Sequence, residues 1–228
     1  EDAHNMTEQN YGKYRSFILS LLLASVLIIS LQSVSAQFVP ATATHLCQSQ
    51  NFFWSGSCWN QSQMNGVTVS HTNQIVTIAG TATNSYWNSE GRIIKRLTHN
   101  SAQVDIALID LPASASSASI WITKDSQNAL IIEKHRDITD PQYNTNVFIV
   151  ERVNGADQFV YVSSDLPSSN FDTYKIQKIV SGYEVYYNGA IVYTGTHDLS
   201  AYNKVELVGV ARASGDQIEA KFRKYREQ

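Results

Sequence analysis

The sequence predicts an all-β protein, because short strand-like runs recur from residue 67 onward, turn residues separate them, and almost no helical periodicity follows Gly66. Many short strands at this spacing are typical of a β-sandwich or barrel, and one domain of that class accommodates about 200 residues. One β domain over residues 66–228 is therefore expected. The expected strands are 67–70, 74–79, 92–97, 103–109, 119–123, 129–135, 146–153, 158–163, 173–180, 183–187, 190–194, 204–212 and 217–225.

The composition excludes two classes of protein. The chain has 228 residues, with 17 basic side chains against 20 acidic ones and a formal net charge of −3. No run of Lys or Arg forms the basic stripe that a nucleic-acid binder needs to neutralise phosphates. Aromatic residues make up 11% of the chain, and β-branched residues are frequent, so intrinsic disorder is not expected either.

The first 36 residues have the parts of a secretory leader. Lys13 and Arg15 precede an apolar run at 17–31, and Val34-Ser35-Ala36 follows as a small-x-small cleavage site. The run is shorter than the roughly 20 residues that span a bilayer, which favours a signal peptide. An uncleaved N-terminal membrane anchor is the alternative. In both cases the remainder is expected to be secreted or at the cell surface, and membrane contact is expected only through the N-terminal segment if that segment is uncleaved.

Two cysteines follow the leader closely, at Cys47 and Cys58. In an oxidising compartment such a pair is expected to form a disulfide, which would pin a leading segment over residues 37–65. A zinc or redox pair is the rival interpretation, but ten intervening residues fit neither. Asn60-Gln61-Ser62 is a glycosylation sequon, with Asn60 as the acceptor.

One hairpin is expected around Asn188-Gly189, which favours a type I′ turn between strands 183–187 and 190–194. A two-residue loop pairs Tyr187 with Ala190. The same register then pairs Tyr186 with Ile191 and Glu184 with Tyr193. The outward face of this hairpin would carry Glu184, Tyr186, Ile191 and Tyr193.

A second hairpin is expected between residues 119–123 and 129–135, with Thr123 opposite Ala129. In that register four aliphatic side chains share the core face. They are Ile120, Ile122, Leu130 and Ile132. The opposite face would carry Trp121, Ile131, Glu133 and His135.

The C-terminal third resembles a known family. Tyr186-Tyr187-Asn188-Gly189 and the closing run Ala220-Lys221-Phe222-Arg223-Lys224-Tyr225 are similar to the late strands of the concanavalin A-like lectin/glucanase superfamily, in its laminin-G-like jelly-roll branch. Arg223 and Lys224 replace the Asp-Asn that is usual there. The resemblance implies a two-sheet antiparallel jelly-roll sandwich, preceded here by the signal or anchor helix. It also implies that one sheet face often binds glycans, that some members hold calcium, and that some are glucanases.

The outward faces of the two hairpins supply the candidate ligand-binding residues. Aromatic rings stack on the C–H faces of sugars, while carboxylate and imidazole groups hydrogen-bond to hydroxyls. The candidates are Trp121, Glu133, His135, Glu184, Tyr186 and Tyr193. Alternatively these aromatic residues only cover a wide sheet, because Tyr and Trp favour strands.

Catalytic and metal candidates are fewer. The glucanase branch carries Glu-x-Asp-x-(x)-Glu on one strand, and no such run occurs here. Glu133 and His135 share a strand face and are the catalytic candidates, although glycoside hydrolysis normally uses two carboxylates. Asp137, Asp140 and Asn144 offer oxygen ligands for calcium in the loop expected after His135, or they only form turns. The six histidines have no zinc-ligand spacing.

These observations predict an exported, non-catalytic module that binds carbohydrate or another extracellular ligand through one sheet face. A divergent polysaccharide hydrolase or lyase is one alternative. A structural or adhesive cell-envelope protein without a small ligand is the other. No cofactor is expected, calcium excepted.

Overall fold

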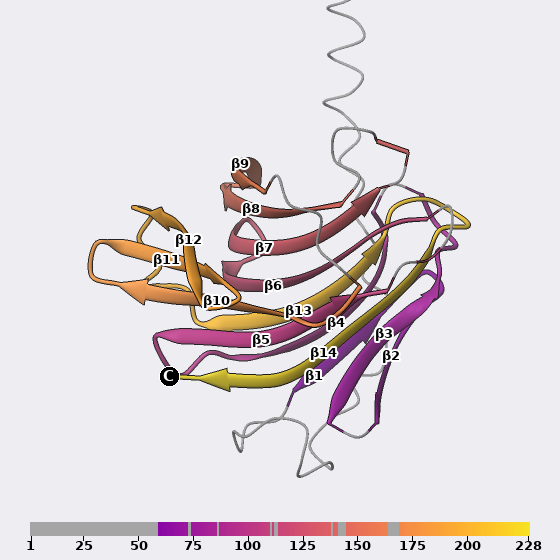
Figure 1. The fold of residues 1–228 in the computed structure, drawn as a ribbon, viewed down its shortest axis with the longest axis horizontal. Helices are drawn as coiled ribbons and strands as arrows, with labels where there is room; N and C mark the ends of the chain where they lie inside the picture. The colour runs from indigo at the N-terminus through magenta and orange to yellow at the C-terminus, as the bar shows by residue number, and fades with distance from the viewer. Residues whose placement is uncertain are drawn as a thin grey trace, which may run out of the picture. The chain divides into compact units, whose positions relative to one another are not determined.

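The computed structural model describes residues 59–72, 74–85, 87–109, 111, 114–137, 139–140, 145–163 and 169–228. These residues form fourteen strands and no α-helix (Figure 1). Within this part of the chain, no helix is long and apolar enough to cross a membrane. The leader, Cys47 and Cys58 lie outside the described residues, so the signal or anchor helix and the disulfide stay predictions.

The strands form two antiparallel sheets of seven strands each, which confirms the predicted all-β sandwich. The front sheet consists, in spatial order, of β1 (Asn60–Gln63), β4 (Ser89–Arg96), β13 (Lys204–Ala211), β6 (Ala115–Asp125), β7 (Asn128–Asp137), β8 (Thr145–Val153) and β9 (Ala156–Val162). The back sheet consists of β12 (Ala190–Gly195), β11 (Gly182–Tyr187), β10 (Asp172–Ile179), β5 (Ser101–Leu108), β14 (Gln217–Glu227), β3 (Ile75–Thr81) and β2 (Val67–Thr72).

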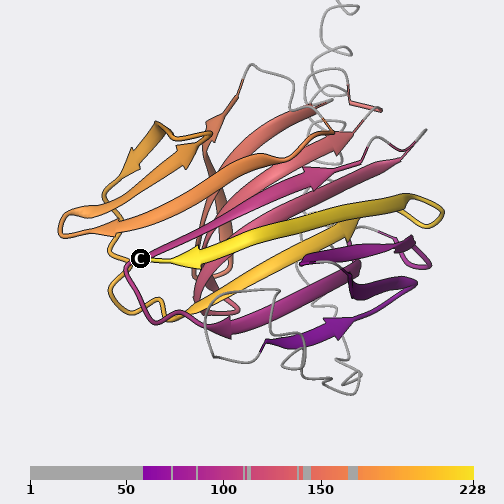
Figure 2. The same ribbon diagram turned by 60° about the horizontal axis from the view of Figure 1, so that its bottom comes forward.

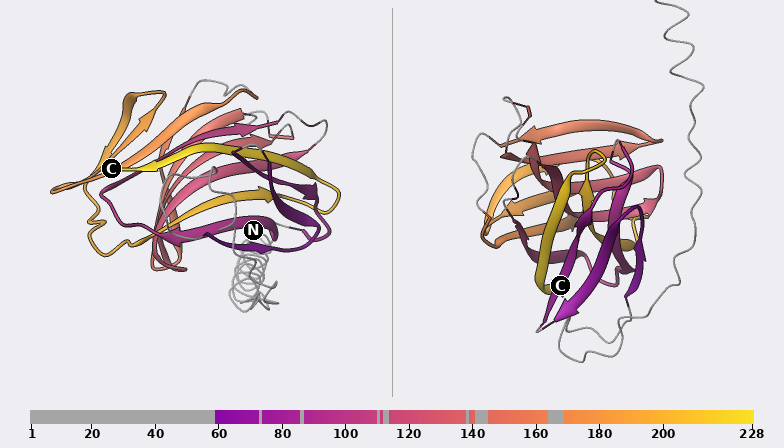
Figure 3. Two further views of the ribbon diagram at one scale, coloured as in Figure 1. Left: turned by 90° about the horizontal axis from the view of Figure 1, so that it is seen from below. Right: turned by 90° about the vertical axis from the view of Figure 1, so that its right-hand side faces the viewer.

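Neighbouring strands often come from distant parts of the chain. The C-terminal strand β14, yellow in Figure 2, lies between β5 and β3, and β13 lies between β4 and β6. Figure 3 shows the same sandwich from below and from the side. The side chains that the two sheets turn toward each other form one continuous apolar core, which includes Ile78, Ile120 and Phe222 at 0% exposure.

Each expected strand is present, and β1 is the strand that the sequence did not indicate. Its residues, Asn60-Gln61-Ser62-Gln63, show no apolar alternation, and they pair with β4 at the edge of the front sheet. Asn60, the sequon asparagine, is exposed at the start of this strand. A short polar strand at the edge of a sheet is held there by backbone hydrogen bonds rather than by buried side chains.

The β6–β7 hairpin confirms its predicted register. Thr123 lies opposite Ala129 and Ile120 lies opposite Ile132. The four inward aliphatic side chains are at most 1% exposed. Because side chains alternate along a strand, Trp121, Glu133 and His135 therefore point away from the core.

For the β11–β12 hairpin, the predicted register is correct next to the turn and wrong farther along the strands. Tyr187 pairs with Ala190 and Tyr186 with Ile191 as predicted, and positive φ angles at Asn188 (49°) and Gly189 (86°) fit a type I′ turn. A β-bulge between Val185 and Tyr186 then places Tyr193 opposite Val185, not opposite Glu184. The Tyr193 ring consequently packs against the core, 6.0 Å from the ring of Tyr183.

Three polar contacts cross the core and join the two sheets. Lys95 of β4 pairs with Glu227 of β14, with 2.6 Å between Nζ and Oε1. Lys134 of β7 pairs with Asp172 of β10, with 2.7 Å between Nζ and Oδ2. Tyr183 of β11 donates a hydrogen bond from its hydroxyl to Glu151 of β8. Each contact has one partner in the front sheet and one in the back sheet.

Glu227 is the most densely bonded of these groups. Its carboxylate, 2% exposed, accepts hydrogen bonds from the backbone and hydroxyl of Thr98 and from the hydroxyl of Tyr225, besides its contact with Lys95. Burial alone would raise the pKa of this carboxyl, but the bonds from Lys95, Thr98 and Tyr225 lower it to about 2. The ionised form of Glu227 therefore stabilises the fold.

We expect Glu227→Gln to lower the free energy of unfolding by about 3 kcal/mol or more, because it removes the carboxylate charge that lies 2.6 Å from the buried ammonium of Lys95. The pair of Lys221 and Glu219, whose side chains are 33% and 35% exposed, provides the control: Glu219→Gln should change the free energy of unfolding by less than about 1 kcal/mol. Urea denaturation at neutral pH measures both. Since the pKa of Glu227 is lowered, its contribution is fully present above about 4.5 and fades as the pH falls toward 2. A wild-type advantage over Glu227→Gln that stayed constant across this range would contradict the assignment.

Candidate functional site

The outer face of the front sheet carries a pocket of about 390 Å³ near the C-terminal end of β7. Three β7 side chains, Glu133, His135 and Asp137, occupy alternate positions on this face. Eight residues line the pocket: Trp87, His135, Asp137, Asp140, Phe148, Phe159, Val162 and Arg212. A cavity of this size matches the lower part of the range for small-molecule sites.

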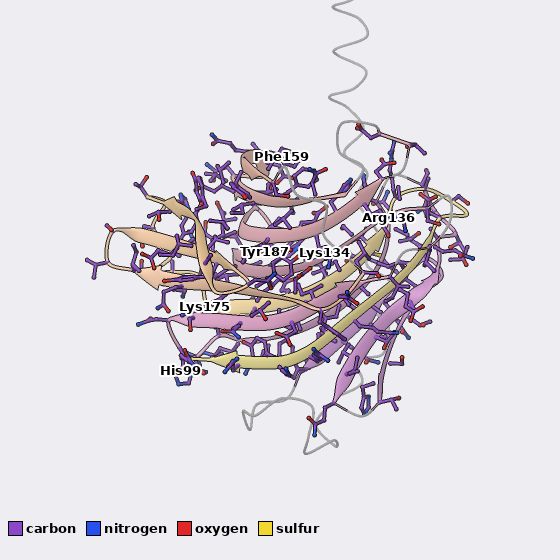
Figure 4. All side chains as sticks on the ribbon, viewed as in Figure 1. His99, Lys134, Arg136, Phe159, Lys175 and Tyr187 are labelled. Atoms are coloured by element: carbon purple, nitrogen blue, oxygen red, sulfur yellow. The ribbon has the colours of Figure 1, made fainter. Side chains whose placement is uncertain are left out.

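Aromatic rings form a continuous row in the pocket. The ring centroid of Trp87 lies 5.5 Å from that of His135, which lies 4.9 Å from that of Phe148. Phe159, on the edge strand β9, packs edge-on against Phe148 at 5.4 Å. The side-chain view in Figure 4 shows Phe159 at the rim of the sheet, and this residue is 61% exposed. The row therefore runs from the half-buried indole of Trp87, through the buried imidazole of His135, to the exposed phenyl ring of Phe159.

His135 is held in place by its neighbours on the same face. It is 8% exposed, and its Nδ1 lies 3.0 Å from Oε1 of Glu133. Asn146 of β8 lies directly across the strand pair from it. The amide nitrogen of Asn146 donates to the carbonyl of Ser163 at 2.6 Å, whereas its buried Oδ1 has no hydrogen-bond donor among the described residues.

Asp137 belongs to strand β7 and not to the loop where the sequence placed it. Its carboxylate pairs with Arg212 and accepts hydrogen bonds from the backbone (3.0 Å) and hydroxyl (2.6 Å) of Thr139. These contacts engage both oxygens, so the calcium prediction for Asp137 and Asp140 receives no support from this geometry. Asn144 lies outside the described residues, and those described contain no group of three or more potential metal ligands.

Trp121 lies on the same outer face, but it is not an open platform. Its Nε1 donates to Ser119 Oγ at 2.7 Å. The guanidinium carbons of Arg92 and Arg152 lie 5.0 Å and 5.2 Å from the ring centroid. Because β4 and β8 lie on opposite sides of β6, the two guanidinium groups approach the ring from opposite directions.

Carboxylates fix these two arginines. Arg92 donates to Glu90 at 2.9 Å and pairs with Glu206, and Arg152 bonds to Asp157 at 2.6 Å. Burial alone would lower the pKa of Arg92, but Glu90 and Glu206 outweigh it and raise the pKa. Both arginines that stack on Trp121 are therefore already paired with carboxylates.

The remaining candidates lie on the other sheet. Tyr186 and Glu184 are on the outer face of the back sheet, where the Tyr186 hydroxyl donates to Glu184 at 2.6 Å and Lys175 lies 4.8 Å from the Tyr186 ring centroid. The outer faces of the two sheets point in opposite directions, so Tyr186 and Trp121 cannot contact one ligand. The prediction of one face that carries both hairpins is wrong. The prediction that Tyr193 points outward is wrong as well, because its side chain packs against the core.

The sequence indicated Glu133 and His135 but missed most of the ring row. Phe148 lies in a run, Val147 to Val150, whose residues are apolar on both faces, so alternation does not reveal its direction. Trp87 lies in a loop before β4, and Arg212 follows β13. Only the order of the strands brings them to the end of β7.

Trp87 adopts a backbone conformation that is unusual for a bulky residue. Its φ is 59°, in the left-handed region, and its backbone N–H donates to the carbonyl of Arg212 at 2.7 Å. Such a conformation costs about 1 kcal/mol or more for a side chain with a Cβ. In this conformation the indole ring lies 5.5 Å from the ring of His135, and strained residues of this kind cluster at functional sites.

We expect Trp87→Gly to be more stable than Trp87→Ala by about 1 kcal/mol, because glycine adopts positive φ without steric cost. Trp121 is the control, since it lies in a regular strand: there the alanine variant should be the more stable one. Urea denaturation of the four variants tests this. An alanine variant at position 87 that equalled or exceeded the glycine variant would contradict the strained conformation.

The comparisons with known proteins concern the fold. No protein-family model matches the chain, and a search of the curated proteins found no match. Among solved structures, a prokaryotic β-1,3-1,4-glucanase (lichenase) derived from a mouse hindgut metagenome has a TM-score of 0.54 at 14% identity, over 73% of this chain and 90% of that one. The Bacillus licheniformis β-glucanase has a TM-score of 0.53 at 13% identity, over 73% and 89%.

A carbohydrate-binding module is similar as well. The module CBM66 from Bacillus subtilis has a TM-score of 0.51 at 14% identity, over 72% of this chain and 92% of that one. Identities this low show the arrangement of strands and nothing about the site. Together with the two seven-stranded antiparallel layers, they establish that the chain has the concanavalin A-like jelly-roll fold.

Proposed function

We propose that this chain is a non-catalytic module that binds a carbohydrate in the pocket on the front sheet. The observation that carries the proposal is the row of four rings, Trp87, His135, Phe148 and Phe159, in a cavity of about 390 Å³. Aromatic faces and edges in a concave site suit the C–H surfaces of a sugar ring. The fold shared with a carbohydrate-binding module and with glucanases supports the same ligand class.

Polar groups at the pocket supply directional contacts. Asp140 and Arg212 line the cavity beside the rings, and His135 presents its imidazole from the floor. Binding sites for small molecules combine such an apolar lining with a few placed polar groups, which fix the orientation of the ligand. A sugar bound here would stack on the rings and hydrogen-bond along one edge.

We expect Trp87→Ala and Phe159→Ala each to weaken glycan binding about five- to tenfold, which corresponds to roughly 1 kcal/mol per stacked ring. Glycan-array screening followed by calorimetry on the strongest ligand measures this. Tyr186→Ala is the matched control, because it removes a ring from the outer face of the opposite sheet and should leave affinity unchanged. Binding that weakened in Tyr186→Ala and not in the other two variants would reject the pocket.

Catalysis is the second candidate, and one observation favours it. Glu133, His135 and Asp137 occupy alternate positions on one face of β7, beside the pocket. Asp137 is engaged by Arg212 and Thr139, which leaves Glu133 as the acid/base of a divergent polysaccharide hydrolase or lyase. Glycoside hydrolysis normally needs a second carboxylate at a controlled separation. The binding module therefore accounts for the site with fewer requirements.

A turnover assay on soluble polysaccharides separates the two candidates. If Glu133 is an acid/base, Glu133→Gln should lower turnover by about a hundredfold or more, whereas Glu184→Gln on the back sheet should not. Under the proposed function, wild-type protein and both variants release no reducing ends or unsaturated products. Turnover in the wild type that Glu133→Gln abolished would replace the binding module with an enzyme.

A structural or adhesive envelope protein remains the third candidate, and the absence of any bound glycan in the array would favour it. Secretion or cell-surface display, which the leader pattern indicates, stays a prediction. The disulfide of Cys47 with Cys58 and glycosylation at Asn60 stay predictions as well.

A further inference from the structure

The middle of the front sheet is covered on its outer face. Four side chains of β6 and β13 point outward there, because they alternate with residues of the core. They are at most 8% exposed: Ser117, Ser119, Val208 and Val210. The next outward residue of β6 is Trp121, and the two arginines on its ring are held by carboxylates. A sugar chain could lie across these strands only by displacing side chains that are already packed.

Trp87 bounds the pocket on the side of β4. It precedes β4, and the strands β13 and β6 separate β4 from β7 in the sheet. Its backbone N–H donates to the carbonyl of Arg212 just after β13, and its ring lies 5.5 Å from that of His135 on β7. The indole group therefore lies on the side of His135 that faces the covered strands.

The ion pair of Asp137 and Arg212 bounds the pocket at the C-terminal end of β7. Arg212 donates to the carboxylate of Asp137 and, at 3.3 Å, to the hydroxyl oxygen of Thr139. Opening this pair would remove the guanidinium group from a carboxylate that is 5% exposed, which is unfavourable. This side of the pocket is therefore closed by a charged contact.

The side of the edge strand β9 is different. Phe159 and Val162 line the pocket, and they are 61% and 40% exposed. Among the described strands, β9 pairs only with β8. In the part of the chain that the structure describes, the exposed apolar lining of the pocket therefore lies over the edge of the sheet, whereas covered or paired residues flank the other sides.

A pocket with one exposed side restricts how a sugar chain can bind. An interior segment of a polysaccharide continues in two directions, so it needs a groove that is open at both ends. A cavity of about 390 Å³ that opens over one edge accommodates a chain end instead.

We propose that the pocket binds the terminal sugar of a glycan chain. The end sugar lies against Trp87 and His135, and the sugars that follow leave over Phe159. This inference rests on the proposed function, because it states which part of a glycan the same pocket holds.

Calorimetry with the full wild-type chain tests the proposal through the length of the ligand. The probes are linear glucose, mannose, galactose and fructose oligosaccharides, each series running from the disaccharide to the hexasaccharide. We expect the affinity of a bound series to change by less than about threefold from the trisaccharide to the hexasaccharide, because the added sugars lie outside the pocket. Binding of a chain interior would instead gain about fivefold for each further sugar that stacks on a ring.

Two variants test the direction of the chain, with the methyl glycosides of the same hexoses and the tetrasaccharides as probes. Trp87→Ala should weaken both kinds of ligand equally, by about five- to tenfold, because both place a sugar against the indole group. Phe159→Ala should weaken the tetrasaccharide about fivefold and the glycoside less than about twofold. Ile191→Ala removes an exposed apolar side chain from the edge strand of the back sheet and should change neither. NMR titration measures the weak binding of the glycosides.

The possible outcomes separate this inference from the proposed function. An affinity that rose further with chain length would overturn the end preference and leave carbohydrate binding intact. Equal losses of both ligands in Phe159→Ala, or loss of the tetrasaccharide alone in Trp87→Ala, would overturn the direction of the chain. If the strongest ligand of the glycan array belongs to another series, its own trimer and hexamer enter the same comparison. Binding of no series and of no glycan on the array would overturn both proposals.

Discussion

The ion pair between Lys134 and Asp172 determines which face of β7 meets the solvent. Lys134 is 1% exposed, and its Nζ donates to Asp172 across the core and to the carbonyl of Asn170 at 3.0 Å. Burial lowers the pKa of this amine, and the bond to Asp172 opposes that shift. A shift of β7 by one residue would move Lys134 to the outer face and bury Glu133 and His135 in the apolar core. Burying these groups would cost several kcal/mol per charge. The core pair thus also fixes the outer face, and with it the position of the imidazole in the pocket.

The alternation of aliphatic residues in β6 and β7 was sufficient to predict their register, because four of them agree on one face and a slip would expose all four. In β11 and β12 the Asn188-Gly189 turn determined only the two adjacent pairs. The bulge at Val185 and Tyr186 reversed the direction of Tyr193, and nothing in the local sequence marks it, since a bulge arises from the twist and packing of the finished sheet. The polar strand β1 was missed for a related reason: its pairing with β4 involves backbone groups, which leave no side-chain pattern.

The residues of the candidate site also fall into those that a local sequence pattern predicts and those that it does not. Glu133 and His135 follow from alternation within one strand, so the sequence could indicate them. Trp87, Phe148 and Phe159 reach the same pocket from a loop, an inner strand and an edge strand, and their meeting depends on strand order, which is a long-range property. The error over Trp121 and Tyr186 has this origin as well. Both point outward from their own hairpins, but no local pattern says to which sheet a hairpin belongs.

Two aromatic regions share the front face, and their surroundings decide which of them can accept a ligand. A ligand on Trp121 would have to displace guanidinium groups that Glu90, Glu206 and Asp157 hold, and so would lose charged hydrogen bonds worth about 1.5–3 kcal/mol each. In the pocket, Phe159 meets Phe148 in an edge contact and stays 61% exposed, so a ligand covers apolar surface there without breaking an ion pair. Covering that surface is favourable at about 25 cal/mol per Å². The free-energy difference therefore favours the rim near β9, where the edge strand leaves apolar side chains open to solvent.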